Sequence, residues 1–151
     1  MNKILVVDDE YAIRLLYQEE LASEGYEVIT AEDCEGLIER IGQQRPDLVV
    51  LDIKMAGVNG LDVLQEIRKV YYDLPIILCT GYLAFKYDLK CLAADYYVLK
   101  SSDLRDLKLK IKTVMEARRS FYEDSLSEKV GKQDSLSIME KETNQGVSHW
   151  P

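Results

Sequence analysis

Short apolar runs alternate with amphipathic stretches five times between residue 3 and about residue 118. Runs of this length, rich in Val, Ile, Leu and Tyr, predict buried strands. Four of them are ILVVD (4–8), LVVLD (48–52), IILCT (76–80) and YYVLK (96–100), and a fifth, YEVITA (26–31), alternates as an edge strand does. Right-handed crossovers place each intervening helix against the sheet, so the pattern predicts an α/β fold. Its parallel sheet would be covered by helices on both faces.

The stretches between the strands carry apolar residues at helical spacing. The predicted inner faces of four helices are Ile13, Leu16, Tyr17 and Leu21; Leu37, Ile38 and Ile41; Leu61, Leu64, Ile67 and Tyr71; and Leu104, Leu107, Ile111, Val114 and Met115. The segment 83–93, LAFKYDLKCLA, has a weaker period, with Phe85, Leu89 and Leu92 on its apolar side. It predicts one more helix.

Length and composition predict a single domain. A chain of 151 residues, of which 47% are hydrophobic, can bury one sizeable core but not two of ordinary size. We expect this domain to span residues 1–118. From residue 119 the sequence is polar and, after about residue 130, aperiodic, so it cannot bury enough apolar surface to offset its ordering entropy. Residues 119–151 are therefore predicted to form a helical extension that fades into a flexible polar tail.

Charge and hydropathy exclude several classes of partner. The net charge of −8 argues against nucleic acid, because phosphate backbones require a basic face, and it suits a protein that binds a cation or docks on other proteins. No apolar run approaches the ~20 residues of a membrane-spanning helix. The short apolar run near the N-terminus ends in acidic residues, so we expect no signal peptide, no membrane contact and a cytoplasmic location. The widely spaced Cys34, Cys79 and Cys91 predict buried reduced thiols rather than a metal or redox site.

Polar and charged side chains stand where four of the predicted strands end. They are Asp8, followed by Asp9 and Glu10, then Asp52, Thr80 and Lys100. Open parallel sheets bind ligands at the carboxyl ends of their strands, so we expect these side chains along one rim. Crowded carboxylates repel one another unless a cation lies among them, and oxygen ligands that are open to solvent suit Mg²⁺.

This set of groups predicts metal-assisted phosphoryl transfer. Mg²⁺ and Lys100 would neutralise the oxygens of the transferring phosphoryl group, and a carboxylate would attack its phosphorus. Asp52 is the predicted nucleophile, since it ends a central strand and faces the other groups. In the alternative, purely structural interpretation, Asp8, Asp9 and Glu10 only cap the first helix, because carboxylates near a helix N-terminus interact favourably with the helix dipole. The presence of Asp52 and Lys100 favours the site.

The chain resembles the receiver domain of two-component response regulators. The motifs that carry the resemblance, in order and spacing across residues 3 to about 118, are ILVVDDE, DLVVLDIKMAGVNGLDVL, IILCTGY and YYVLK. Within that family the chain is most similar to the stand-alone receivers of sporulation phosphorelays. The resemblance implies a doubly wound, flavodoxin-like (CheY-like) sheet of five parallel strands in the order 2-1-3-4-5. It also implies a single-domain response regulator.

The resemblance assigns a phosphoacceptor and a metal site. Asp52 would take a phosphoryl group from a sensor histidine kinase or a histidine phosphotransfer protein. Asp8, Asp9 and Asp52 would hold Mg²⁺, helped by the backbone carbonyl of Lys54. The protein would not be an enzyme that turns over a substrate, since its chemistry would be limited to its own phosphorylation and dephosphorylation.

The resemblance also assigns a switch. Lys100 would bind a phosphoryl oxygen, and Thr80 would move to donate a hydrogen bond to the phosphoryl group. Tyr97 would then turn inward behind Thr80, because the movement of Thr80 vacates space that the ring can fill. The altered surface would be read by a downstream protein target. Formation of a homodimer is left open.

Several positions depart from the family's pattern. Ala56 stands where the family usually has proline, while Gly57 and Gly60 remain to supply positive backbone angles. Ser101 follows Lys100, where the family commonly has a proline after a cis bond. Because a cis bond before serine costs about 3 kcal/mol, either that strain is retained or the loop holds Lys100 differently. The interval from Thr80 to Lys100 is also shorter than is common.

Two other hypotheses remain open, the first of which is motivated by these departures. In the first, the chain is a pseudo-receiver that keeps the fold as a docking module and is not phosphorylated. In the second, it is a phosphatase of the haloacid dehalogenase kind, which also uses Asp, Mg²⁺ and Lys. That family places its nucleophile in a D-x-D pattern after the first strand, and VVDDEYA lacks it.

Overall fold

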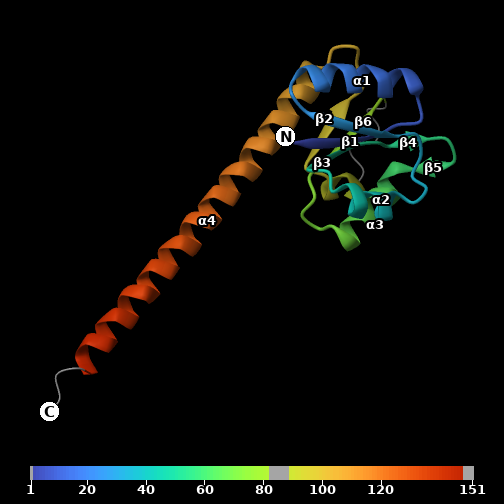
Figure 1. Cartoon of the computed structure of the whole chain (residues 1–151). Helices are drawn as coiled ribbons and strands as arrows, with labels where there is room; N and C mark the ends of the chain where they lie inside the picture. Colours follow the sequence, from blue (N-terminus) through green and yellow to red (C-terminus); the bar gives the residue numbers. More distant parts are fainter. Residues whose placement is uncertain (1, 82–88, 148–151) are drawn as a thin grey trace. The chain divides into compact units, whose positions relative to one another are not determined.

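The structure, a computed structural model, describes residues 2–81 and 89–147 (Figure 1). The chain divides into two compact units, Met1–Val114 and Met115–Pro151. The first unit holds a five-stranded sheet, which consists of β1 (Lys3–Val7), β2 (Glu27–Ala31), β3 (Leu48–Asp52), β6 (Ile76–Thr80) and β7 (Tyr96–Leu99). All neighbouring strands are parallel, in the order β2-β1-β3-β6-β7. The predicted doubly wound order 2-1-3-4-5 is confirmed, with β2 at one edge.

Helices cover both faces of this sheet. They are α1 (Tyr11–Ser23), α2 (Leu37–Gln44), α3 (Gly60–Val70) and the start of α4 (Arg105–Val147). Figure 1 shows α1 on one side of the strands and α2 and α3 on the other. The predicted helix over 83–93 is only partly testable, because residues 82–88 lie outside the described residues. Its last residues, Leu89–Ala93, form a short 3-10 helix, η2, in place of an α-helix.

Two layers of apolar side chains follow from the alternation of each strand. One layer lies against α2 and α3 and contains the strand residues Leu5, Val7, Val49, Leu51, Ile76 and Leu78. The intervening strand residues, Ile4, Val6, Val50 and Ile77, are equally buried on the opposite face. The continuous apolar runs of the sequence are therefore explained by strands that have no solvent-facing side.

Arg68 ties the end of α3 to two neighbouring segments. Its guanidinium donates to the backbone carbonyl of Ala93 over 2.6 Å, to that of Leu74, and to the carboxylate of Asp95 over 3.0 Å. The same carboxylate accepts the backbone N–H of Ile76 at 2.8 Å. Arg68 and its partner Asp95 thus satisfy backbone groups just before β6, at the start of β6 and before β7, which helps to set the register of the edge strand.

We predict that Arg68→Met lowers the free energy of unfolding by about 2 kcal/mol, because the carbonyls that it serves lose a charged donor. Urea denaturation measures this change. Lys69→Met is the matched control, since Lys69 is the exposed neighbour on the same helix and, among the described residues, its ammonium pairs with the exposed Glu66 at 2.9 Å. Equal stability of the two variants would contradict the role of Arg68.

The helix α4 begins in the first unit, where Leu107 and Ile111 are buried. There Lys108 pairs with Glu20 of α1 at 2.8 Å and with Glu24, the C-cap residue of α1, at 3.3 Å. It continues to Val147, beyond residue 130, where the aperiodic composition predicted that the helix would fade. The division at residue 118 and the flexibility of the tail stay predictions. In the described part of the chain, no helix combines the length and the hydropathy that crossing a bilayer requires.

Candidate functional site

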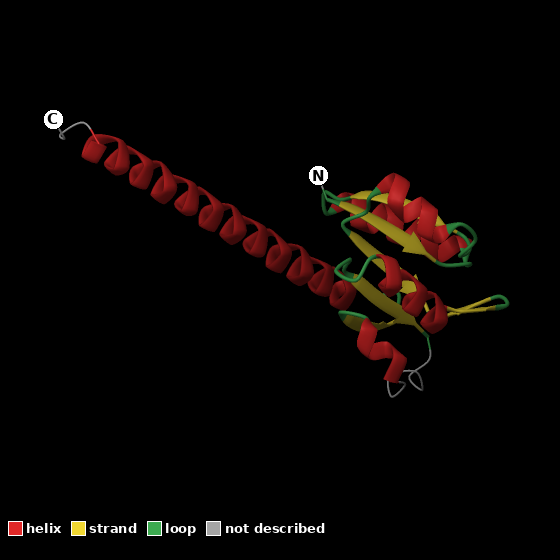
Figure 2. Cartoon of the chain, turned by 90° about the horizontal axis from the view of Figure 1, so that it is seen from below, coloured by secondary structure: helices red, strands yellow, loops and turns green. Residues whose placement is uncertain are grey.

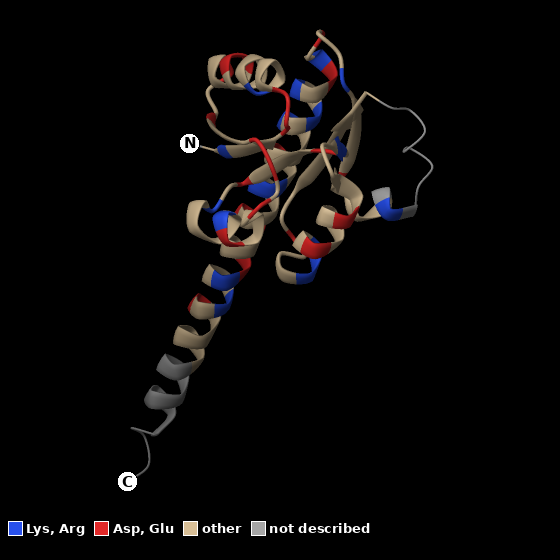
Figure 3. Ribbon diagram, turned by 90° about the vertical axis from the view of Figure 1, so that its right-hand side faces the viewer, with Lys and Arg blue, Asp and Glu red and all other residues tan. Residues whose placement is uncertain are grey.

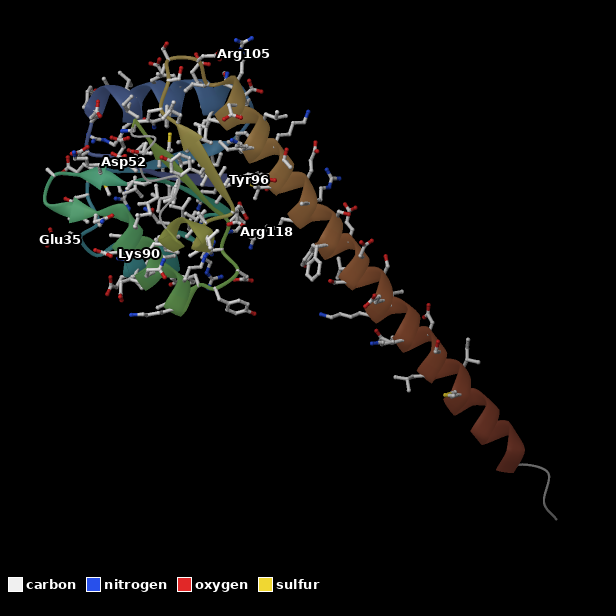
Figure 4. All side chains as sticks on the ribbon, turned by 180° about the vertical axis from the view of Figure 1, so that it is seen from behind. Glu35, Asp52, Lys90, Tyr96, Arg105 and Arg118 are labelled. Carbon is white, nitrogen blue, oxygen red and sulfur yellow. The ribbon has the colours of Figure 1, made fainter. Side chains whose placement is uncertain are left out.

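The polar residues that end the strands lie at one rim of the sheet. Asp8 follows β1, Asp52 ends β3, Thr80 ends β6 and Lys100 follows β7. These four belong to adjacent strands of a parallel sheet, which is why residues so far apart in the sequence meet. Asp8 and Asp52 are buried, with only 2% and 3% of their surface exposed. Figure 4 labels Asp52 at this end of the strands.

The ammonium of Lys100 lies between the carboxylates. Its Nζ is 2.6 Å from Oδ2 of Asp8, 3.1 Å from Oδ2 of Asp52 and 3.4 Å from Oε1 of Glu10. The sequence assigned Lys100 to a phosphoryl oxygen and did not foresee its contact with Asp8. Three of the predicted site residues, Asp8, Asp52 and Lys100, are therefore in direct contact.

The backbone places Lys100 without an unusual peptide bond. No peptide bond in the described parts of the chain is cis, so the Lys100–Ser101 bond is trans. The N–H of Lys100 donates to the carbonyl of Thr80 at 2.7 Å, which extends the β6–β7 pairing by one residue. The sequence left two arrangements open for Ser101, a strained cis bond or a loop that holds Lys100 differently. The structure has the second.

Burial governs the electrostatics of these groups. It raises the pKa of Asp52 to about 6, and the charge of Asp8 adds to the rise, while Lys100 and the N–H of Lys54 lower it only in part. Burial alone would lower the pKa of Lys100, but its hydrogen bond to Asp8 and the charges of Asp8 and Asp52 raise it well above its usual range. Lys100 thus stays protonated, and one ammonium does not offset both buried carboxylates.

The donor set fits a divalent cation. One carboxylate oxygen each from Asp8, Asp9 and Glu10 lie within 4.8 Å of one another. Oxygen donors of this kind, at the mouth of an open cleft, suit Mg²⁺, which keeps several waters. The cleft is lined by Asp9, Glu10, Asp52, Lys54, Met55, Ala56, Gly57, Gly81 and Lys100. Figure 3 colours the acidic residues red, and several of them lie on loops beside the strands.

The backbone N–H of Lys54 contacts the carboxylate of Asp52. Its N–H lies 3.4 Å from Oδ1 of Asp52, and its side chain is exposed at the cleft. The predicted role of its carbonyl as a metal ligand stays a prediction, as do the metal roles of Asp8, Asp9 and Asp52.

A small hairpin that the sequence analysis missed forms one wall of the cleft. It pairs β4 (Lys54–Met55) with β5 (Val58–Asn59) around the turn Ala56–Gly57 (Figure 2). Gly57 has a φ of 73°, as predicted. The N–H of Ala56 donates to Oδ2 of Asp9 at 3.0 Å and so joins the hairpin to the loop after β1. A glycine in the second turn position was the available signal for this hairpin.

The expected positive φ at Gly60 is wrong. Gly60 is needed because its backbone passes close to the end of β3: a Cβ atom there would lie 2.1 Å from the carbonyl oxygen of Asp52 and 2.7 Å from Cα of Ile53. Its N–H donates to the carbonyl of Ile53 at 2.6 Å. Close packing of α3 on the strand end, rather than backbone conformation, therefore requires glycine at this position.

Thr80 and Tyr97 lie on the same face of the sheet. Thr80 is fully buried. Tyr97 is half-buried against the core and pairs in register with Leu78, two residues before Thr80. Side chains two positions apart on a strand share a face, so Leu78 and Thr80 point to the same side. The ring of Tyr97 lies beside Leu78 and is therefore two positions along the strand from Thr80 on that face. The switch roles of both residues stay predictions.

Two further sequence interpretations concern the cap of the first helix and the cysteines. The N-cap of α1 is Glu10, which makes no side-chain capping bond, although Oδ1 of Asp8 accepts the N–H of Glu10 at 2.9 Å. Cys79 is buried, with its Sγ 3.2 Å from the hydroxyl of Tyr17, and Cys34 is half-buried; neither is in a disulfide. The side chain of Cys91 lies outside the described residues.

Comparisons with known proteins agree with this geometry. A family model for the response regulator receiver domain matches residues 4–112. The response regulator protein TrrA from Thermotoga maritima, solved in complex with Mg²⁺–BeF, is 49% identical; the match covers 76% of this chain and 99% of TrrA, with a TM-score of 0.73. TrrA was also solved in complex with the histidine kinase ThkA, and that structure matches with 48% identity, the same coverage of this chain, 98% of the other and a TM-score of 0.71.

Curated relatives are similar over the same region. The probable transcriptional regulator ycf27 from Guillardia theta is 41% identical over 116 residues, which is 76% of this chain and 45% of the relative. Sporulation initiation phosphotransferase F from Bacillus subtilis (strain 168) is 36% identical over 81 residues, which is 54% of this chain and 65% of the relative. The chain thus spans about half the length of the first of these relatives, and similarity is shared between sporulation and transcriptional regulators.

Proposed function

This chain belongs to the response regulator receiver family, and on that premise we propose that it is a switch that accepts a phosphoryl group on Asp52 and changes its protein contacts. The observation that carries the proposal is the contact of one ammonium, Lys100, with two buried carboxylates at the rim of the sheet. Such a cluster is costly to bury unless it serves a reaction or a ligand. The donor would be a histidine kinase or a histidine phosphotransfer protein, and the complex of TrrA with ThkA supports a kinase.

The chemistry begins at Asp52. A carboxyl with a pKa of about 6 is mostly ionised at neutral pH, yet more basic than an ordinary aspartate, which favours nucleophilic attack. One of its oxygens forms a bond to phosphorus while the bond from phosphorus to the donor's imidazole nitrogen breaks. The electron pair passes to the imidazole, which then takes a proton. The product on this chain is an acyl phosphate.

Lys100 and the acidic residues stabilise the charge that moves. The ammonium of Lys100, already 3.1 Å from Asp52, is placed to contact a phosphoryl oxygen once Asp52 is phosphorylated. Asp8, Asp9, Asp52 and the carbonyl of Lys54 would hold Mg²⁺, which, when bound, neutralises charge on the phosphoryl oxygens.

The phosphoryl group would then act on the buried Thr80. New acceptor oxygens beside that hydroxyl favour an inward position of its side chain, and Tyr97 on the same face can fill the space that is vacated. The exposed side of β7 changes as a result. A downstream protein target that prefers one of the two surfaces would read the switch.

Incubation with acetyl phosphate and Mg²⁺ tests this proposal. We expect the intact chain to gain one phosphoryl group, measured by mass, and labelling to fall by about tenfold or more when a chelator removes Mg²⁺, because the metal offsets transition-state charge. Labelling that persists in excess chelator would contradict the metal-assisted mechanism. A chain that gains no phosphoryl group and binds no beryllofluoride would instead be the docking module.

A further inference from the structure

The turn of the small hairpin has a specific backbone geometry. Met55 pairs with Val58, so Ala56 and Gly57 are its two central residues. Of these two, only Gly57 has a positive φ. A positive angle at the second position alone is the pattern of a type II turn, whose first position commonly holds proline. The backbone at Ala56 therefore does not depend on alanine, but the N–H at that position does depend on the absence of proline.

That N–H makes a long-range contact. It donates to Oδ2 of Asp9 at 3.0 Å, and the two residues are 47 positions apart in the chain. Both residues line the cleft. Asp9 is exposed, and among the hydrogen bonds of the described residues this is the one that its carboxylate accepts. This bond therefore restricts the rotation of an otherwise solvent-exposed carboxylate.

We propose that the Ala56 amide is a positioning group that orients the Asp9 carboxylate for Mg²⁺, an inference that rests on the proposed function. The tethered carboxylate still has an oxygen within 4.8 Å of oxygens from Asp8 and Glu10, so the tether holds it inside the acidic cluster. A hydrogen bond to Oδ2 leaves Oδ1 free as a ligand. Ordering the side chain before the metal arrives removes an entropy cost from binding.

The variant Ala56→Pro removes this one donor and suits the turn. Met55, which precedes it, is already in a strand, the conformation that proline requires of its neighbour. We expect Mg²⁺, titrated alone and followed by backbone amide NMR shifts in the cleft, to bind at least about fivefold more weakly to Ala56→Pro. Ala56→Ser keeps the N–H and should stay within about twofold of the unmodified chain. Urea denaturation of both variants checks that the fold is kept.

A second measurement, hydrogen exchange of the Ala56 amide, keeps alanine at residue 56 and so does not depend on how a substitution there affects the turn. The amide proton of Ala56 should exchange with solvent more slowly than it does in Asp9→Ala, and that protection should persist when Mg²⁺ is added. Loss of the protection on adding Mg²⁺ would overturn the proposal, because the amide would then compete with the metal.

The outcomes separate this inference from the proposed function. If the unmodified chain binds Mg²⁺ and accepts a phosphoryl group while Ala56→Pro binds Mg²⁺ equally tightly, only the role of the amide is wrong. If the unmodified chain binds no Mg²⁺, both the metal site and the positioning role are wrong.

Discussion

Replacing Asp52 by asparagine should reduce phosphoryl transfer from acetyl phosphate by at least about 100-fold, because the amide keeps the shape of the side chain and loses its nucleophile. Intact mass after incubation with acetyl phosphate and Mg²⁺ measures the loss. Asp62→Asn is the matched control, since Asp62 is exposed on α3 and pairs with Lys90 outside the cluster. Its labelling should equal that of the unmodified chain. Undiminished labelling of Asp52→Asn would refute the assignment of the phosphoacceptor.

Unfolding should not explain that loss. Burial raises the pKa of Asp52 above its ordinary value, so the folded state binds a proton more tightly than the unfolded state does. This carboxyl therefore contributes stability at low pH, which is lost as the pH rises through about 6. Asp52→Asn lacks that dependence, because the amide does not titrate. Relative to the unmodified chain, we expect the variant to become more stable as the pH rises from acid to neutral.

Replacing Lys100 by methionine should lower the free energy of unfolding at neutral pH by about 3 kcal/mol or more, because two buried carboxylates lose their shared counter-charge. Urea midpoints measure this change. Lys108→Met is the matched control: Lys108 also bridges two carboxylates, Glu20 and Glu24, but both are half exposed, so its loss should matter far less. Equal effects at the two lysines would show that burial of the pair at Lys100 is energetically unimportant.

The pH dependence of Lys100→Met has a defined sign. Lys100 lowers the pKa of Asp52, so its removal raises that pKa further above the ordinary value. The stability lost at neutral pH should therefore return as the pH falls and Asp52 takes up a proton. Added Mg²⁺ should also restore part of it, since a ligand that binds only the folded state stabilises that state. A variant that loses stability on mild acidification would contradict this account.

The parallel sheet was predictable because its signals are local. Runs such as LVVLD are short and apolar on both sides, which is what a strand covered on both faces requires, and the chain's alternation of strands and helices leaves few topologies open. The placement of Asp8, Asp52 and Lys100 at one rim followed from the same reasoning, since the carboxyl ends of parallel strands share a rim. The receiver family was recognisable for this reason.

Other features depend on main-chain contacts between segments that are far apart in the sequence. The periodicity of side chains carries no information about such contacts. The close approach of Gly60 to Asp52 involves main-chain atoms, so the sequence showed a glycine but suggested the wrong reason for it. The segment 89–93 is a 3-10 helix packed beside α3, where Lys90 pairs with Asp62 at 2.8 Å, and its weak period did not distinguish it from an α-helix. The helix α4 also continues beyond residue 130 to Val147, where the polar, aperiodic composition had predicted that the helix would fade.

The sequence by itself determined the class of fold and the residues that end the strands, because apolar runs and the polar residues after them are local features of the chain. The order of the strands in the sheet was implied by the resemblance to receiver domains. Only the tertiary structure decided how those residues are paired. It placed Lys100 against Asp8 as well as Asp52, kept the bond after Lys100 trans, and brought the amide of Ala56 to Asp9 across 47 positions. These pairings depend on distances of about 3 Å between separate segments, which packing sets and residue patterns do not encode.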